Sequence, residues 1–591
     1  MNKSKLFIER LQKRKEVEEN VIKLCLSSRV KNKDILSLIR EIVPKISKII
    51  HRGSLVFNQL LLYCLNEDQT IPDFSDISLF ERCFRVGIEK YKTRGYELIQ
   101  DVFKKYFQDF PLLGRFKGDT QIIQYAAKTY QTNFKNMLIV PFEKRLKTFL
   151  KEYSRRYETN NISIYVMMDL VIGKKKFEDY ELNEKLLGIL GVLRIYLKIK
   201  DSEVVTKIWK EKNLAGLLNF YHYLIMQNEA WKCKNFTIAP ISSIKNHFIT
   251  IDSVILRELM INIDLLPAVN KSRKFTQEEI LEDWNNLFKI KNCNGKEFSR
   301  LIQTDGVSLC IHYQRPKRIS VIPSFPTNPQ RIIGIDPGRV NIQFGVDSNG
   351  EEYKLTRKQY YQQSGMVKNK KKVEKWNLKN KEIMIKLSKN SSKSNDLTNY
   401  LTIVSENYDK LWNNQKSLKW SRERMHLWIG KNRTLDRFYA SMGKGAIIAY
   451  GSAKFAPTGP GELAVPTSSA FKRCSKHFKI KLIDEFRTSK MCNSCEGELT
   501  KLFIRDEEIR GFRQCCSIVC QRKLVGRDSN AAKNIRDCYL ERPNCLRRNW
   551  KDSGISSRNL SNTLQSLENG ISRKSPIESL VKSRLQPTIF D

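Results

Sequence analysis

The spacing of hydrophobic positions changes near residue 270, and this change divides the chain into regions. In the first part, apolar residues recur at helical intervals, as they do at Leu182, Leu186, Ile189, Leu190, Leu193 and Leu197. An apolar stripe with this period is typical of amphipathic helices. We therefore expect residues 1–270 to form a mostly helical lobe that also contributes some segments to a neighbouring β domain.

The pattern becomes strand-like from Phe298 to Pro326. This stretch contains TDGVSLCIHYQRP and RISVIPSFP, which are rich in β-branched residues and bounded by prolines. Such composition favours strands. We expect residues 271–330 to form a small β-rich segment.

Three acidic residues follow apolar runs or begin a helical pattern in the last half of the chain. Asp336 follows the predicted strand Ile332 to Ile335, and a second strand is predicted from Asn341 to Val346. Glu485 follows the apolar run that ends at Ile483, and Asp528 precedes a helical stripe of Ala531, Ala532 and Ile535. Acids on two strands and a helix suit a ribonuclease-H-like α/β fold, which we expect over residues 331–490 and 522–540.

Carboxylates gathered in this way can hold divalent metal ions. Two Mg²⁺ ions about 3.5–4 Å apart stabilise the attacking and leaving oxygens when a phosphodiester is hydrolysed. Each acid also has an ordinary structural interpretation. Asp336 can cap a turn, Asp528 suits the first turn of any helix, and Glu485 can be a surface residue beside Arg487.

A long insertion separates the first strands from a further predicted strand, Lys444 to Tyr450. It covers about residues 355–442. Its segment from Asp396 to Trp412 places apolar residues on one helical face. We expect helices here that cross the active site.

Five of the 14 cysteines lie between Cys492 and Cys520. Cys492-x2-Cys495 is followed about twenty residues later by Cys515-x4-Cys520, the spacing of a structural zinc site that uses four thiolates. Cys516-x3-Cys520 is also allowed, so Cys516 is an alternative to Cys515. We expect one zinc ion in a small element at residues 491–521.

The charge of the chain indicates a polyanionic partner. Lysine and arginine number 105 against 63 acidic residues, which gives a net charge of +42 over 591 residues. Basic runs such as Lys368 to Lys375 lie near aromatic residues, among them Trp376 and Trp420, and this combination is typical of nucleic-acid binding. No apolar run approaches the about 20 residues that span a bilayer. Residues 541–591 are polar and basic, and we expect a poorly ordered tail.

Taken together, several motifs resemble the RuvC nuclease of TnpB and Fanzor proteins, transposon-encoded RNA-guided DNA endonucleases related to type V CRISPR effectors. These motifs are GIDPGRVN, AIIAYGSAKF, LIDEFRTSKMCNSC and GRDSNAAKNI, with TSK-x-C-x2-C the most specific. TDGVSLCIHYQRP and RKQYYQQSG are similar to the eukaryotic Fanzor branch. The resemblance covers about residues 304–535. It implies a multidomain α+β protein with a helical recognition lobe, a small wedge-like β domain and a RuvC nuclease that contains a zinc element.

The resemblance also implies the site residues. Most TnpB proteins have a catalytic glutamate directly after the strand that here reads AIIAY, but this chain has Gly451. Fanzor proteins resemble one another in placing that glutamate downstream, where Glu485 stands. The implied catalytic set is Asp336, Glu485 and Asp528 with two Mg²⁺ ions, and Asp484 replaces Glu485 if the strand register shifts by one residue. The family spacing favours Cys515 over Cys516.

The implied partners are a guide (omega) RNA and target double-stranded DNA, bound by a monomeric protein that reads a short target-adjacent motif. The expected location is a nucleus. Three alternatives stay open: a catalytically silent RNA-guided or DNA-binding protein, favoured by Gly451; an RNA-independent transposase; and an ATP-handling protein of the actin and sugar-kinase type. The last predicts glycine-rich phosphate loops, and none follows Asp336.

Overall fold

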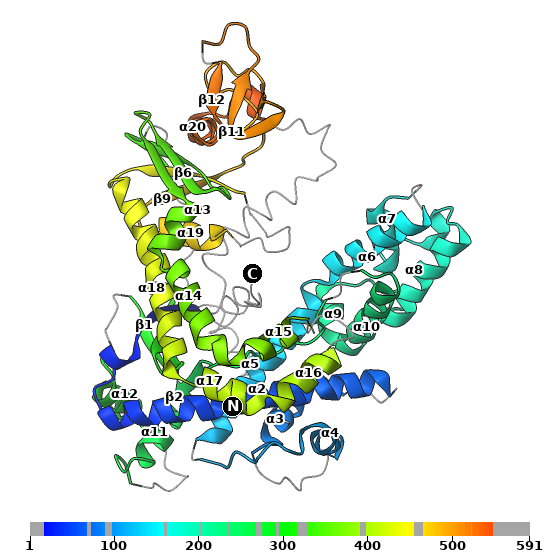
Figure 1. Ribbon diagram of the computed structural model, residues 1–591, viewed down its shortest axis with the longest axis vertical. Helices are drawn as coiled ribbons and strands as arrows, with labels where there is room; N and C mark the ends of the chain where they lie inside the picture. The colour runs from blue at the N-terminus through cyan, green and yellow to red at the C-terminus, as the bar shows by residue number, and fades with distance from the viewer. Residues whose placement is uncertain are drawn as a thin grey trace, which may run out of the picture.

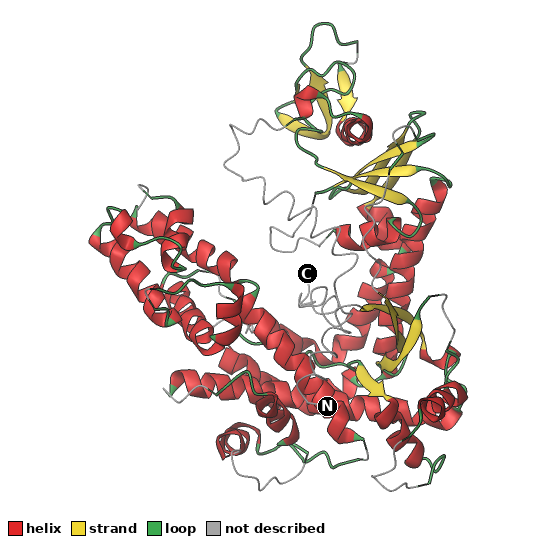
Figure 2. Cartoon of the chain, turned by 180° about the vertical axis from the view of Figure 1, so that it is seen from behind, coloured by secondary structure: helices red, strands yellow, loops and turns green. Residues whose placement is uncertain are grey.

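The computed structural model combines many helices with β-sheets that pack against them (Figures 1 and 2). It describes residues 17–547 except 68–71, 89–96, 117, 159–161, 201, 234–235, 268–274, 291–294, 317–324, 327–328, 390–396, 454–464 and 522. The protein is thus a mixed helical and sheet multidomain chain. Within these residues, no helix is both long and apolar enough to cross a membrane.

The N-terminal lobe is built around the 34-residue helix α2. The Asn32 side chain begins this helix by accepting hydrogen bonds from the backbone of Asp34 and Ile35. Gly53, in the middle of α2, packs directly against Phe84 of α3, because a Cβ at Gly53 would overlap the phenyl ring. The helices of the lobe are α2 (Lys33–Asn66), α3 (Ile77–Arg85), α4 (Glu97–Phe107), α5 (Asp119–Ile139), α6 (Phe142–Tyr157), α7 (Ile164–Val171), α8 (Glu184–Leu197), α9 (Lys207–Lys212), α10 (Leu214–Ala230), α11 (Ser253–Ile261) and α12 (Gln277–Leu287).

A four-stranded antiparallel sheet joins distant parts of the chain. Its order is β1-β4-β3-β2, with β1 at Val17–Cys25, β2 at Ile249–Asp252, β3 at Glu297–Thr304 and β4 at Ser308–Pro316. The segment predicted over 271–330 therefore supplies only β3 and β4, and two strands come from the region predicted to be mostly helical. A search for helical periodicity does not indicate either strand, although β1, with nine residues, is as long as β4. The run RISVIPSFP lies mostly outside the described residues.

The insertion forms six helices among the described residues: α13 (Arg357–Gln363), α14 (Met366–Asn377), α15 (Lys381–Lys389), α16 (Leu397–Glu406), α17 (Tyr408–Gln415) and α18 (Leu418–Ser441). The prediction that the segment 396–412 crosses the active site is wrong. Leu401 and Val404 of α16 and Trp412 of α17 are buried in the hydrophobic core of the N-terminal lobe, and α16 packs on α2. The apolar face that suggested helices is therefore used for packing against that lobe. Helix α18 contacts both β4 and β7 and so connects the two larger sheets (Figure 1).

The second large sheet has five strands in the order β7-β6-β5-β8-β9. They are β5 (Ile332–Asp336), β6 (Asn341–Asp347), β7 (Glu352–Thr356), β8 (Ile447–Gly451) and β9 (Lys479–Ile483). Strands β5, β8 and β9 run parallel, whereas β6 and β7 are antiparallel. Helix α19 (Thr467–Cys474) packs against α18, and α20 (Arg527–Leu540) packs on β5, β6 and β8.

A three-stranded sheet of β10 (Leu499–Ile504), β11 (Glu507–Cys515) and β12 (Leu524–Gly526) lies between β9 and α20 in the chain. After α20, the described part of the predicted tail is ordered up to residue 547. Leu546 is fully buried, and Arg542 donates to the Leu546 carbonyl. The prediction of a poorly ordered tail is therefore wrong for residues 541–547, because Leu546 packs with Tyr539 in a small apolar core. The rest of that tail lies outside the described residues.

Candidate metal and active site

Asp336 is the last residue of β5, the central strand of the five-stranded sheet. Ile333 and Ile335 are fully buried, which fixes the strand in the sheet and leaves Asp336 at its carboxyl end. In the parallel pairing with β8, Ile335 lies opposite Tyr450. Residue 451 therefore ends the neighbouring strand at the same edge of the sheet as Asp336.

Glu485 occupies the space that Gly451 leaves open. Gly451 pairs with Ile483, the last residue of β9, and Glu485 follows two residues later. A Cβ added at Gly451 would overlap Glu485 Oε1 and lie 2.7 Å from Glu485 Cδ. The same Oε1 accepts a hydrogen bond from the Ala453 backbone nitrogen at 2.9 Å. The absence of a side chain at Gly451 is thus what allows Glu485 to reach this edge of the sheet.

Helix α20 brings Asp528 to the same place. A Cβ at Gly334 of β5 would overlap the Ala532 carbonyl oxygen and lie 2.6 Å from the Arg536 nitrogen, so the helix backbone rests directly on the strand. Asp528 stands in the first turn of α20, where the helix dipole favours a carboxylate. Asn341 of β6 donates a hydrogen bond from Nδ2 to Asp528 Oδ2 at 2.6 Å.

The electrostatics of the acids show that they influence one another. Burial, followed by the neighbouring Glu485 and Asp528 carboxylates, raises the pKa of Asp336 well above its usual range, and the Arg527 guanidinium opposes this rise. Burial also raises the pKa of Glu485 to about 7, against the hydrogen bond from Ala453. A cation placed between these acids would favour their charged forms and lower their pKa values.

Carboxylate oxygens are the ligands that Mg²⁺ prefers, and it is commonly bound by one or two carboxylates with phosphate oxygens from the substrate. The donor set of Asp336, Glu485 and Asp528 fits such an ion. Asp484 is placed differently: its carbonyl accepts from Arg542 Nη2 at 2.7 Å, and Glu485, rather than Asp484, is among the groups that raise the pKa of Asp336.

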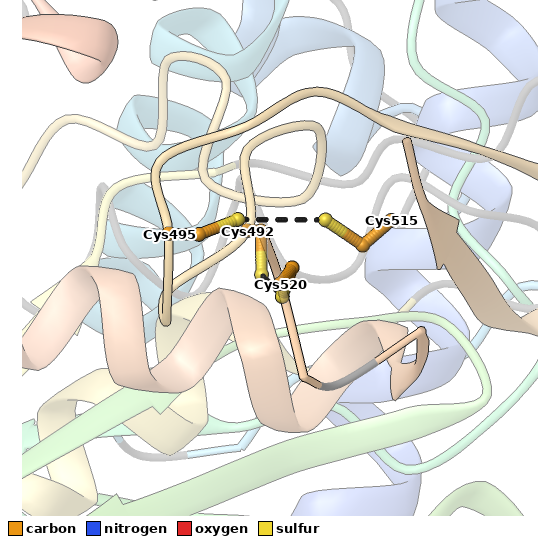
Figure 3. A group of neighbouring side chains, drawn as sticks. All are labelled: Cys492, Cys495, Cys515 and Cys520. Atoms are coloured by element: carbon orange, nitrogen blue, oxygen red, sulfur yellow. Dashed lines mark hydrogen bonds between the residues drawn. The ribbon is translucent and has the colours of Figure 1, made fainter. Parts of the chain in front are cut away.

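Four thiols form a second, more compact cluster. The Sγ atoms of Cys492, Cys495, Cys515 and Cys520 all lie within 4.8 Å of one another and point toward a common centre (Figure 3). The Cys492–Cys520 and Cys495–Cys515 separations are 3.9 and 3.5 Å. Zn–S bonds of about 2.3 Å in a tetrahedron place sulfurs about 3.8 Å apart. The four cysteines can therefore hold a metal ion such as zinc.

Cys516 lies outside this cluster. It is exposed, and its Sγ is 3.5 Å from the Thr500 hydroxyl. The backbone at Gly497 lies beside the thiol cluster. A hydrogen bond from the Gly497 backbone lowers the pKa of the Cys495 thiol to about 7. Gly497 is also close to Cys495, because a Cβ there would lie 3.3 Å from its Sγ.

Sequence reasoning missed the residues that position the acids. Gly334 and Asn341 belong to the motif GIDPGRVN, but the sequence offers no sign that α20 rests on one and that the other bonds to Asp528. Asn530 and Asn534 of GRDSNAAKNI are almost fully buried and bond to the Thr488 and Met491 carbonyls. Two asparagines four residues apart share one face of the helix, but the sequence alone does not show that this face is buried.

Comparison with known proteins gives limited information. A family model described as a domain of unknown function, DUF8286, matches residues 249–315, which run from β2 to β4. No curated protein matches the sequence. Among solved structures, the chain is similar to that of a Cas12f1–sgRNA–target DNA complex, with a TM-score of 0.25 and 12% identity over 88% of this chain and 99% of that one.

It is also similar to a Cas12i–crRNA–dsDNA complex, with a TM-score of 0.22 and 10% identity over 93% of each chain. At such TM-scores the two likenesses establish neither the fold nor the activity of this chain. Statements about the fold and the activity of this chain therefore rest on the geometry of the site and on the sequence motifs.

Proposed function

We propose that the protein is an RNA-guided DNA endonuclease with a rearranged ribonuclease-H-like (RuvC) active site. Asp336, Glu485 and Asp528 would hold two Mg²⁺ ions there and hydrolyse phosphodiester bonds of target DNA. The observation that carries this proposal is the position of Glu485, which fills the space over Gly451 at the same sheet edge as Asp336. If Gly451 only marked the loss of a catalytic glutamate, no second glutamate would be expected to fill the space above it.

In this proposal each residue of the site has a role. When bound, two divalent ions would stabilise the attacking and leaving oxygens of the phosphodiester. Asp336, Glu485 and Asp528 would together hold the ions, since the pKa of Asp336 is raised by both of the other carboxylates. Asn341 would keep Asp528 oriented through its hydrogen bond. Arg527, which is exposed beside Asp528, would hold a phosphate of the strand being cut.

Several features support a nucleic-acid substrate. The net charge is +42, and helix α14 presents an exposed basic surface. Its exposed lysines are Lys368, Lys370, Lys371, Lys372 and Lys375. Helix α14 buries Asn377 alone among its described side chains, so it contributes little to a core. Phosphate binding through such lysines releases counterions, which makes affinity fall steeply with salt.

RNA guidance and a transposon-derived omega RNA rest on the motif resemblance. In this account the guide RNA pairs with one DNA strand, and the protein reads a short flanking motif. The four cysteines would hold a structural zinc, since four thiolates leave no open position for a reacting water. We place the protein in a nucleus as a monomeric ribonucleoprotein, with Lys370 to Lys372 as a candidate import signal.

The test is cleavage of a plasmid with a randomised region beside the target, by protein co-expressed with its own downstream RNA. The wild type should cut in Mg²⁺, next to one short motif, and Asp336→Asn should lose activity by at least about 100-fold. A wild type that retains RNA and binds its target without cutting would establish the catalytically silent alternative. Protein that joins or cuts DNA without any retained RNA would favour the transposase.

A further inference from the structure

The turn after Glu485 links the acid site to the cysteine cluster. The Glu485 carbonyl accepts hydrogen bonds from the Thr488 nitrogen at 3.2 Å and from the Thr488 hydroxyl at 3.0 Å. Thr488 is only 3% exposed, and the chain continues from it to the first thiol ligand, Cys492. Seven residues after Glu485, and four after Thr488, the backbone therefore enters the cysteine cluster.

Two asparagines of α20 hold this turn in place. Asn530 donates from Nδ2 to the carbonyls of Thr488 and Met491 at 3.2 and 2.7 Å. Asn534 donates to the same two carbonyls at 2.8 and 2.9 Å. Because both side chains follow Asp528 on the same helix, the turn and Asp528 are attached to one rigid element.

Asn493 closes the connection from the side of the cysteines. It lies between Cys492 and Cys495, and its backbone nitrogen donates to Asn530 Oδ1 at 2.9 Å. Its Nδ2 donates to Asn534 Oδ1 at 3.1 Å and to Asp537 Oδ2 at 2.6 Å. Each of the two helix asparagines therefore donates from its amide nitrogen to the Thr488 turn and accepts at its amide oxygen from Asn493 in the cysteine loop.

This network is buried, so its parts depend on one another. Asn530 and Asn534 are 4% and 3% exposed. Leaving a buried carbonyl without its donor costs about 1–3 kcal/mol. Each asparagine satisfies the same two carbonyls, which makes the double replacement more damaging than either single one. A cysteine loop that moved without its metal would pull Asn493 away from both helix asparagines.

We propose that Asn493, Asn530 and Asn534 are positioning residues that couple zinc binding at the four cysteines to divalent-metal binding at the acids. The proposal rests on the two-metal function proposed above. Zinc would fix the loop of Asn493, the asparagines would transmit that order to the Thr488 turn, and the turn would place Glu485 beside Asp336. By linkage, a divalent ion at the acids would in turn tighten the binding of zinc by the same factor.

The experiment uses the full-length protein, with Mn²⁺ as the probe of the acid site. Electron paramagnetic resonance measures bound Mn²⁺ for protein with zinc and for protein freed of zinc by dialysis against a zinc-selective chelator. Asp336→Asn identifies the fraction of Mn²⁺ bound at the acids. The test variant is Asn530→Ala with Asn534→Ala. The matched control is Asn432→Ala, which removes an asparagine bonded to the Trp428 carbonyl on α18, away from both sites.

In the wild type and in Asn432→Ala, zinc removal should weaken Mn²⁺ binding at least about fivefold, the lower end of usual coupling. In the double variant, Mn²⁺ binding should already be weak with zinc bound, and zinc removal should change it less than about twofold. Equal Mn²⁺ affinity of the wild type with and without zinc would overturn the coupling. So would a double variant that keeps the zinc dependence of the wild type.

Hydrogen exchange separates this proposal from the proposed function. Amide exchange over residues 484–492 should accelerate when zinc is removed from the wild type, and in the double variant it should be fast with zinc still bound. If no Mn²⁺ binding depends on Asp336, the nuclease proposal fails, yet exchange in this pattern would still establish the connection between zinc and the Glu485 turn. Exchange that ignores both zinc and the asparagines would overturn it.

Discussion

The cysteine cluster and the acid site lie next to each other in the fold but are built in opposite ways. Among the described residues, the Sγ atoms of the four cysteines all lie within 4.8 Å of one another, which is close enough to hold one metal ion. The three acids lie close enough to raise the pKa of Asp336, but they form no such tight group. The cysteine cluster could enclose an ion with protein ligands alone, whereas the acids are too far apart to do so without ligands from elsewhere.

This difference agrees with the function that we propose for each site. A structural zinc needs four protein ligands and no open position. A magnesium ion that acts on a phosphodiester must instead accept phosphate oxygens and water, so fewer carboxylates serve it better. The compact site can stabilise the fold and the open one can perform chemistry, so zinc content reports directly on the first and DNA cleavage on the second.

Loss of a zinc ligand is expected to have the largest effect. Cys492→Ser removes a buried thiol from the cluster, and we expect bound zinc to fall from one per chain to almost none and the melting temperature to drop by several degrees. Zinc released to a chromophoric chelator and calorimetry measure both. Cys516→Ser is the control, since its exposed thiol lies outside the cluster. Equal zinc loss in both variants would show that Cys516, too, is a ligand.

The next largest effect should come from filling the space under Glu485. Gly451→Ala places a methyl group where Glu485 Oε1 lies, so the carboxylate must move. A displacement of about 1 Å can cost about 100-fold in rate, and we expect a loss of that order in DNA cleavage. Zinc content should be unchanged. Gly188→Ala on α8, where a Cβ meets nothing within 4 Å, is the control. Full activity of Gly451→Ala would mean that Glu485 has no catalytic part.

A smaller effect is expected from the hydrogen bond that orients Asp528. Asn341→Ala leaves all three acids in place but removes the donor to Asp528 Oδ2. We expect cleavage to slow about tenfold, the value of one hydrogen bond to a charged group of about 1.5 kcal/mol. The rate should recover in part at higher Mg²⁺, which single-turnover kinetics can measure. Asn349, which is exposed in the turn after β6, is the control, and Asn349→Ala should cleave as the wild type does.

The smallest expected effect is the pH dependence of stability without divalent metal. Glu485 has a folded-state pKa of about 7 against an ordinary value of 4.5. The folded protein therefore binds more protons than the unfolded chain between these values, so this group's contribution to stability falls as pH rises through that window. Melting temperatures at pH 5.5 and 8 would show a smaller decrease for Glu485→Gln. Added Mg²⁺ should stabilise the wild type more at pH 8, where the acids are ionised.

The sequence predicts the acid site better than its surroundings. Asp336 and Asp528 stand out because each sits where a strand ends or a helix begins, and such boundaries are visible in the apolar pattern. Glu485 required the family resemblance, and the choice between it and Asp484 depends on a register that only the pairing of Gly451 with Ile483 reveals. The choice of Cys515 over Cys516 likewise depended on the resemblance.

The parts that escaped sequence reasoning are long-range contacts. Strands β1 and β4 pair Ile22 with Ile311, nearly three hundred residues away, and no local pattern indicates that partner. The apolar face of α16 shows a helix but not that it packs on α2 rather than across the acids. The asparagines of α20 are polar in sequence, and only burial against the Thr488 turn shows what they do.

The central claim is that Glu485 supplies the second acid of the active site, and comparing Glu485→Gln with Asp484→Asn tests it most directly. Both neighbours lose one charge with little change of shape, and single-turnover cleavage of target DNA by the guide-loaded protein is measured for each. We predict that Glu485→Gln abolishes cutting while target binding and zinc content stay normal, and that Asp484→Asn cuts within about threefold of the wild type. Cutting by Glu485→Gln at the wild-type rate would contradict the account.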